Sequence, residues 1–154
     1  AILLLIGPTE KQVRRIVSHS STMLDIKATG PIPKEELSQY MTAADVFIMP
    51  YTSKVSNIGR WPNKIGDYMS VGRPTVSNPV GEVKWLFERY DVGLLADETP
   101  ESMAEAVIKL LHSPDRATSI GRNARQVAET IFAWGKLIVH LEDWYYGLIA
   151  HRQN

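Results

Sequence analysis

The chain has 154 residues, of which 44% are hydrophobic, as is typical of one globular domain with its own core. Seventeen lysine and arginine residues balance seventeen aspartate and glutamate residues, so the charge predicts no nucleic-acid partner. The absence of cysteine excludes disulfide frameworks and cysteine nucleophiles. The longest apolar runs, such as residues 1–6, are too short to cross a membrane. We therefore expect a cytoplasmic protein that is at most peripheral to the membrane.

Short apolar runs alternate with segments of helical periodicity along the whole chain. The apolar runs predict strands over residues 2–6, 23–29, 46–49, 74–77 and 92–96. The periodic segments predict helices over residues 9–20, 35–44, 62–71, 82–90, 100–112, 114–130 and 132–151. Such alternation indicates the α/β class, with a doubly wound parallel sheet and helices on both of its faces.

The first predicted helix has a clear amino-terminal signal. Thr9 is followed three residues later by Gln12, which is the spacing of a capping box. Val13, Ile16 and Val17 have helical spacing, and we expect them to form its buried stripe.

Later elements have boundary signals of their own. The run at 46–49 is short and continuous, as expected of a strand that is buried on both faces. Gly72 is placed to end the helix before it. Thr99 and Ser113 each precede a proline, so both are predicted to cap a helix.

In sheets of this type, ligands bind beyond the carboxyl ends of the strands. The residues expected at those ends are Gly7-Pro8, Gly30-Pro31-Ile32, Pro50-Tyr51, Ser77-Asn78 and Asp97. The glycine-rich dinucleotide motif, the P-loop and the G-x-S-x-G elbow are all missing from the sequence. The four histidines are scattered without metal-ligand spacing, so we expect no metal site.

The stretch from residue 56 to residue 74 contains the most informative chemistry. A glycine-containing loop leads into a helix whose first N–H groups form an anion site. Arg60 and Lys64 add the positive charge that a diphosphate needs, and Asp67 could accept two hydroxyl groups of a ribose. The alternative from the pattern alone is a solvated helix face with an ion pair between Lys64 and Asp67.

The run P-N-K-I-G-D-Y-M-S-V-G-R-P at residues 62–74 resembles the motif of group 1 glycosyltransferases, the retaining family four of the GT-B superfamily. The G-P-I-P-K-E-E-L run at 30–37 and the Y-M-T-A-A-D-V-F-I-M-P run at 40–50 are similar to two further blocks of its carboxyl-terminal domain. The F-A-W-G-K-L run at 132–137 is similar to its closing helix.

This resemblance implies a nucleotide-sugar site in a Rossmann-like domain. Asp67 corresponds to the second carboxylate of the family's E-x7-E motif, which holds the donor's ribose. Ile58, Gly59 and Arg60 match the loop that holds the phosphates, and Gly30, Pro31 and Ile32 match the loop that reads the base. Two features depart from the family: Gly59 stands where the motif has its first carboxylate, and the family's Arg and Lys pair would lie upstream of residue 1.

The resemblance therefore implies that residues 1–154 form the single donor-binding domain of a longer chain, one half of a GT-B enzyme. The amino-terminal acceptor domain and the first strand of the donor domain would be absent, so this part alone is expected to be inactive. The whole protein would transfer a sugar from a nucleotide diphosphate sugar with retention and without a metal or cofactor. No catalytic residue is identified. Because Gly59 replaces an acid, the alternative is a non-catalytic nucleotide- or sugar-phosphate-binding module, and an interaction domain without a ligand is a third.

The helix predicted at residues 132–151 contains more apolar residues than are needed to pack on one face of a single domain. An inner stripe is predicted to pack on the domain's own sheet, and it consists of Trp134, Leu137, Ile138, Leu141, Tyr145 and Leu148. Trp144, Tyr146 and Ile149 flank this stripe, and we expect them to dock on the absent domain. A membrane surface, reached only through a lipid-linked acceptor, is the competing partner, but the helix lacks an excess of basic residues.

Overall fold

The computed structural model describes residues 1–17 and 25–151, with the backbone alone for residue 151. The chain divides into two compact units, Ala1–Ala44 and Asp45–Asn154, which are described separately. The end of the first predicted helix and the start of the second predicted strand lie outside the described residues.

The first unit pairs two short strands in parallel. Strand β1 (Leu3–Leu5) is aligned with β2 (Ile26–Ala28), and helices α1 (Glu10–Val17) and α2 (Lys34–Thr42) complete the unit. The predicted capping box is confirmed, because the Thr9 N–H donates to the side chain of Gln12 at 2.7 Å. The predicted stripe of α1 is wrong at Ile16, whose side chain is 80% exposed.

The second unit contains a parallel sheet of three strands in the order β3-β4-β5. These strands are β3 (Phe47–Met49), β4 (Thr75–Ser77) and β5 (Gly93–Leu95). The helices are α3 (Val55–Ile58), α4 (Asn63–Val71), α5 (Glu82–Tyr90), α6 (Pro100–Leu111), α7 (Pro114–Thr130) and α8 (Trp134–His151). Only α3 was not expected, because the sequence there predicts a polar loop.

Helices cover both faces of this sheet. Ser77 pairs with Met49 across β4 and β3, so these two residues share a face, whereas Val76 points to the opposite face. Met49 belongs to a core cluster with residues of α4, α5 and α7, and Val76 belongs to a second cluster with residues of α6 and α7. The predicted α/β class, with parallel strands flanked by helices, is therefore confirmed.

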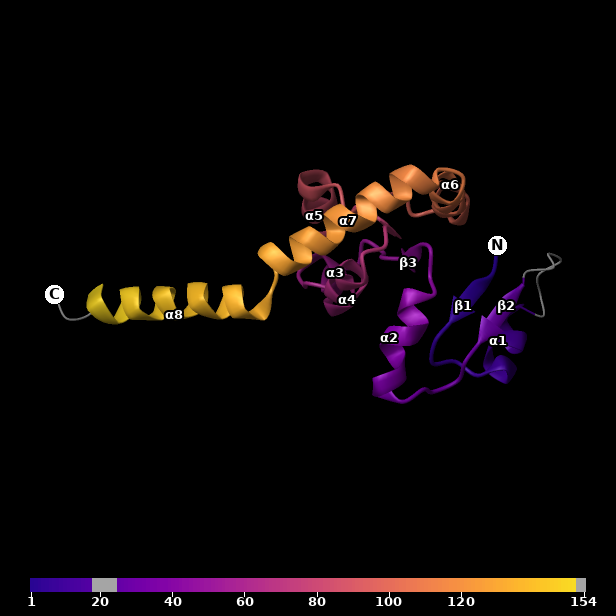
Figure 1. Cartoon of the computed structure of the whole chain (residues 1–154), viewed down its shortest axis with the longest axis horizontal. Coiled ribbons are helices and arrows are strands. Elements are labelled where there is room, and N and C mark those ends of the chain that lie inside the picture. Colours follow the sequence, from indigo (N-terminus) through magenta and orange to yellow (C-terminus); the bar gives the residue numbers. More distant parts are fainter. Residues whose placement is uncertain (18–24, 152–154) are drawn as a thin grey trace. The chain divides into compact units, whose positions relative to one another are not determined.

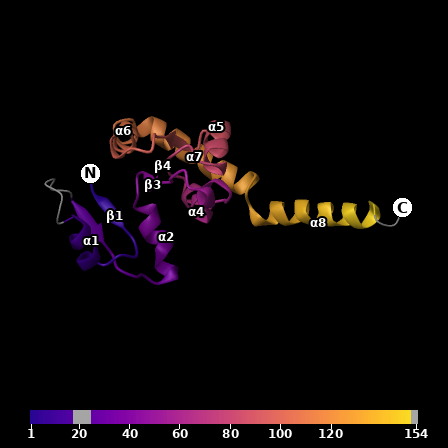
Figure 2. The same ribbon diagram turned by 180° about the vertical axis from the view of Figure 1, so that it is seen from behind.

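Helix α4 is fixed mainly by α7, which lies beside α4 and α5 in both views (Figures 1 and 2). Ile65 and Met69 are fully buried on the inner side of α4. Gly72 ends the helix in the left-handed region with φ of 75°, which also confirms the prediction. A Cβ atom at Gly121 of α7 would collide with the carbonyl oxygen of Gly72, so the two backbones are in direct contact.

Three other predictions about packing and capping are wrong. Ser113 makes no capping hydrogen bond, although Pro114 does open α7. The strand at 46–49 is not buried on both faces, because Ile48 is 36% exposed. The inner stripe of α8 does not pack on the sheet, since its large apolar residues, from Trp134 to Leu148, are all exposed.

Candidate functional site

A buried amide joins the carboxyl ends of the three strands in the second unit. The side chain of Asn78, which follows β4, accepts a hydrogen bond from the Tyr51 N–H at 2.8 Å. Its amide nitrogen donates to the carbonyl oxygens of Ala96 and Asp97 at 2.9 and 2.8 Å. Because Tyr51 follows β3 and Ala96 follows β5, this side chain sets the spacing of all three strand ends.

The loop between β3 and α3 has a second attachment near the end of β5. The carboxylate of Glu98 accepts hydrogen bonds from the N–H of Ser53, at 3.2 Å, and from its hydroxyl group. This loop is thus held at two points before it reaches the predicted phosphate-binding residues.

Ile58, Gly59 and Arg60, the predicted phosphate-binding loop, lie at the end of α3, whose last residue is Ile58. The turn before α5 packs directly against the backbone of Ile58, because a Cβ atom at Gly81 would lie 2.5 Å from the carbonyl oxygen of Ile58. Gly59 has an ordinary φ of −90°, and a Cβ atom there would meet nothing closer than 3.8 Å. The backbone conformation therefore does not require glycine at position 59. The absence of the family's first carboxylate at this position changes the chemistry of the site and is not imposed by the fold.

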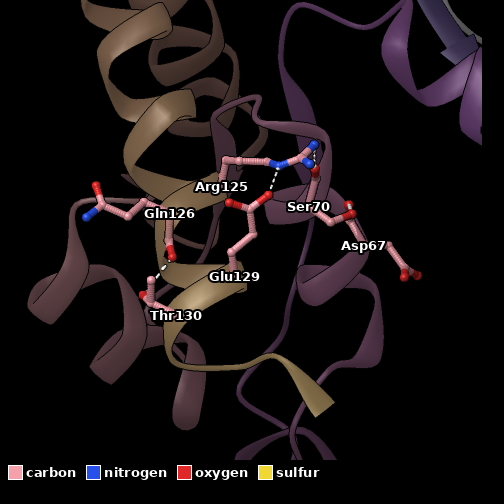
Figure 3. Close-up of polar contacts among 6 residues, drawn as sticks. All are labelled: Asp67, Ser70, Arg125, Gln126, Glu129 and Thr130. Atoms are coloured by element: carbon pink, nitrogen blue, oxygen red, sulfur yellow. Dashed lines mark hydrogen bonds and ion pairs between the residues drawn. The ribbon is translucent and has the colours of Figure 1, made fainter. Parts of the chain in front are cut away.

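Lys64 and Asp67 lie on the exposed side of α4, in the first and second turns. Their side chains form no ion pair with each other, and the Asp67 carboxylate has no partner among residues 1–17 and 25–150. Figure 3 shows this carboxylate pointing away from Arg125, which instead binds the carboxylate of Glu129 and the carbonyl oxygen of Ser70. The alternative of a Lys64–Asp67 ion pair is therefore not observed.

Two aromatic side chains stabilise this region from the inside. Tyr68 stacks on Phe47 with ring centroids 4.2 Å apart, and burial, followed by the nearby charge of Asp67, raises the pKa of the Tyr68 hydroxyl group. The Trp61 ring stacks on Phe132 with ring centroids 5.0 Å apart, so it packs the end of the loop against the residue that follows α7.

Gly30, Pro31 and Ile32, the predicted base-reading loop, lie in the first unit. Gly30 adopts a φ of 68°, and its N–H donates to the carbonyl oxygen of Pro8 at 2.9 Å. This bond joins the loops that follow β1 and β2, so this predicted part of the site also lies at carboxyl strand ends.

The described part of the chain has no group of three or more His, Asp or Glu side chains that could hold a metal ion. It also has no helix that is both long and apolar enough to span a membrane.

Comparison with known proteins identifies the family. A family model described as "Glycosyl transferases group 1" matches residues 1–113, which is well over half of the chain. The chain belongs to the glycosyl transferases group 1 family.

Related proteins of this family are considerably longer than the chain. A GDP-mannose-dependent alpha-(1-6)-phosphatidylinositol monomannoside mannosyltransferase of Mycobacterium tuberculosis is 25% identical over 151 residues, covering 95% of this chain and 39% of that protein. The amylovoran biosynthesis glycosyltransferase AmsK of Erwinia amylovora is 27% identical over 128 residues, covering 82% of this chain and 31% of that protein. The chain thus spans about two fifths or less of these relatives.

Solved structures of glycosyltransferases share the fold. A sucrose-phosphate synthase of Thermosynechococcus elongatus has a TM-score of 0.78 at 22% identity, covering 97% of this chain and 39% of its own. HepE of Anabaena, solved in complex with UDP, has a TM-score of 0.77 at 16% identity, covering 94% of this chain and 40% of its own. At these identities the comparison establishes the fold alone.

Sequence reasoning located the strand ends of this group 1 glycosyltransferase chain but missed the side chains that organise them. Tyr51 and Asn78 are expected from the sequence only as residues at strand ends, and Ser53 and Glu98 are not predicted to have a role there. Asn directly after a buried strand is the one signal that could have indicated Asn78, because a buried amide needs several hydrogen-bond partners.

Proposed function

We propose that this chain is the donor-binding domain of a glycosyltransferase that takes its sugar from a nucleotide diphosphate sugar. The observation that carries the proposal is the unpaired, exposed carboxylate of Asp67 on the helix that follows a loop with Arg60 and Lys64 nearby in sequence. In this proposal Asp67 accepts hydrogen bonds from the ribose hydroxyl groups.

Phosphate binding is assigned to the loop and the start of α4. Pro62 precedes α4 and provides no side-chain cap, and its carbonyl oxygen accepts a hydrogen bond from the Ile65 N–H at 3.0 Å, so the N–H groups of Asn63 and Lys64 are those proposed to bind the anion. The loop Ile58–Gly59–Arg60 and the charge of Lys64 complete this site, while Gly30, Pro31 and Ile32 are proposed to read the base. These groups would stabilise the charge that grows on the diphosphate as the bond to the sugar breaks.

The proposed transfer retains the anomeric configuration and needs no metal, as the resemblance to retaining family members implies. The catalytic groups that face the sugar and the acceptor site belong, in this proposal, to an amino-terminal domain outside residues 1–154. The relatives support this arrangement because the chain covers only 39% of the mannosyltransferase. We further propose that the protein acts in the cytoplasm, reaching a membrane only through a lipid-linked acceptor.

The test of the proposed function begins with a panel of nucleoside diphosphates, whose binding is measured by calorimetry on the complete natural polypeptide. Asp67→Asn is expected to weaken the best ligand about tenfold or more while leaving the melting temperature almost unchanged, since a bond to a charged group is lost. Asp143→Asn, a change at an exposed aspartate of α8, is the matched control. Equal affinity of Asp67→Asn and the natural protein would contradict the ribose role.

A second pair of variants tests the phosphate role. Arg60→Ala and Lys64→Ala should weaken the nucleoside diphosphate more than the corresponding nucleoside, because charge-assisted bonds act only where the ligand is charged. Equal losses for both ligands would instead indicate a misfolded loop.

A non-catalytic nucleotide- or sugar-phosphate-binding module is the second candidate function, and Gly59 is the observation that favours it. A Cβ atom fits at this position, so the loop itself does not exclude the family's acid. Turnover of a nucleotide sugar by the complete polypeptide would exclude this candidate, whereas binding without turnover across the panel would support it.

We also propose that α8 docks on the rest of the natural polypeptide. The apolar side chains along this helix are exposed, including Trp144 at 59%, Tyr146 at 71% and Ile149 at 54%. Apolar surface of this extent is typical of an interface. Hydrogen exchange over residues 144–149 is expected to be slower in the complete polypeptide than in residues 1–154. Identical exchange in both, with protection appearing only on added liposomes, would favour a membrane surface instead.

A further inference from the structure

The guanidinium group of Arg60 is held by the side chains of Tyr51, which follows β3, and Asn57, which lies in α3. Its Nε–H donates to the hydroxyl oxygen of Tyr51 at 2.9 Å, and its Nη2 donates to Oδ1 of Asn57 at 3.0 Å. The guanidinium carbon also lies 5.6 Å from the centroid of the Tyr51 ring. An exposed arginine would otherwise sample many rotamers, so these contacts restrict its orientation.

Tyr51 is itself a rigid support. Only 6% of the residue is exposed, and its ring belongs to the larger core cluster of the sheet. Its N–H is bound by Asn78, which is 3% exposed and also holds the carbonyl oxygens of Ala96 and Asp97. The hydroxyl group of Tyr51 therefore cannot shift without disturbing the strand ends.

The two contacts leave one edge of the guanidinium group open. Tyr51 accepts from Nε and Asn57 accepts from Nη2. Nη1 donates to no group among residues 1–17 and 25–150, so the open edge of the guanidinium group is the one that carries Nη1. Its N–H groups can donate to the oxygens of a phosphate.

We propose that Tyr51 is a positioning residue, whose hydroxyl group orients Arg60 so that the open edge receives the diphosphate of the donor. This inference rests on the proposed function, which assigns phosphate binding to Arg60. An arginine that is already ordered loses less side-chain entropy when the ligand binds, so the hydroxyl group contributes to affinity without touching the ligand.

Tyr51→Phe separates this role from the packing role of the ring, because it removes only the hydroxyl group. Tyr90→Phe is the matched control, since the Tyr90 hydroxyl group also accepts a hydrogen bond from an arginine Nε, that of Arg89, at 3.3 Å. Both variants are expected to melt within a few degrees of the natural protein.

The experiment measures binding of inorganic pyrophosphate to the complete natural polypeptide, together with the nitrogen-15 signal of Arg60 Nε. Tyr51→Phe should weaken pyrophosphate about two- to tenfold, the range expected for one side chain that must be ordered on binding. It should also shift the Nε signal toward that of a free arginine. Tyr90→Phe should change neither quantity, and adding Tyr51→Phe to Arg60→Ala should cause no further loss of affinity.

The outcomes distinguish the two proposals. If Arg60→Ala leaves pyrophosphate binding unchanged, the phosphate role in the proposed function is wrong. If Arg60→Ala weakens binding but Tyr51→Phe does not, or if the two losses add independently, the positioning role is overturned. An unshifted Nε signal in Tyr51→Phe overturns it without reference to any ligand. Should Tyr51→Phe fail to fold, Asn57→Ala removes the other contact of Arg60, and the same weakening of pyrophosphate is expected.

Discussion

The contact between the turn before α5 and the phosphate-binding loop predicts a large difference between two glycines. Gly81 has φ of 53° and ψ of −134°, a combination that residues other than glycine rarely adopt. A Cβ atom there would lie 2.5 Å from the carbonyl oxygen of Ile58 and 3.0 Å from its Cα atom. Gly59, the residue directly before Arg60, has φ of −90°, and a Cβ atom there would only reach ordinary contact, 3.8 Å, with the carbonyl oxygen of Val55.

Gly81→Ala should therefore be costly. Backbone strain of about 1–3 kcal/mol adds to overpacking of about 1–3 kcal/mol, which gives a loss of roughly 2–6 kcal/mol in the free energy of unfolding. For a chain of this size, the melting temperature should fall by about 4–24 °C. Gly59→Ala should change the free energy of unfolding by less than about 1 kcal/mol, and in the stabilising direction, because alanine restricts the unfolded chain.

Urea denaturation monitored by circular dichroism measures the free energy of unfolding of both variants, whose substitutions lie in the same structural unit, residues 45–154. Pyrophosphate binding gives a second measurement, since displacement of Ile58 in Gly81→Ala should also weaken the phosphate site. A Gly81→Ala variant as stable as the natural protein, or a Gly59→Ala variant that loses as much as Gly81→Ala, would refute the close contact between these loops.

Two further predictions concern helix caps and pH. Thr99→Ala should cost about 1 kcal/mol, because the Thr99 hydroxyl group accepts a hydrogen bond from the Ser102 N–H at 3.2 Å, whereas Ser113→Ala should cost much less since Ser113 makes no such bond. Urea denaturation of both variants checks this difference. Because burial raises the pKa of Tyr68, its contribution to stability is fully present below about pH 10 and is lost as the pH rises above that value. The natural protein should therefore lose stability more steeply than Tyr68→Phe as the pH rises above about 10, and parallel curves would contradict the shift.

The sequence predicted the parts of this fold that depend on local signals. Residues 82–90 and 114–130 have the helical bounds expected from their periodicity, and Gly72 ends α4 as predicted. Helix α3 was missed because Val55–Ile58 is a single turn, too short to show a periodicity. The loop that precedes it is attached to Glu98, a residue more than forty positions away, and such a contact has no local signal in the sequence.

The candidate site shows the same division between local and distant information. The exposed side of α4, with Lys64 and Asp67, follows from helical spacing alone. The orientation of Arg60 does not, because it depends on a hydrogen bond to Tyr51, whose own position is fixed by Asn78 across the sheet. Hydrogen bonds between residues distant in sequence leave no periodic pattern, so residue spacing could not predict them.

The residues that shape the site are buried or fixed by their backbone, whereas the residues proposed to bind the ligand are exposed. Substitutions in the two groups should therefore differ in their effect on stability. Asn78 is buried, and Gly81 is fixed by its backbone conformation, so changes there should lower stability and binding together. Arg60, Lys64 and Asp67 are exposed, so changes there should alter binding with little effect on stability. Tyr51 belongs to both groups, because its ring is part of the core and its hydroxyl group contacts Arg60. Removing the hydroxyl group alone should therefore change the orientation of the Arg60 side chain while leaving the stability of the fold almost unchanged.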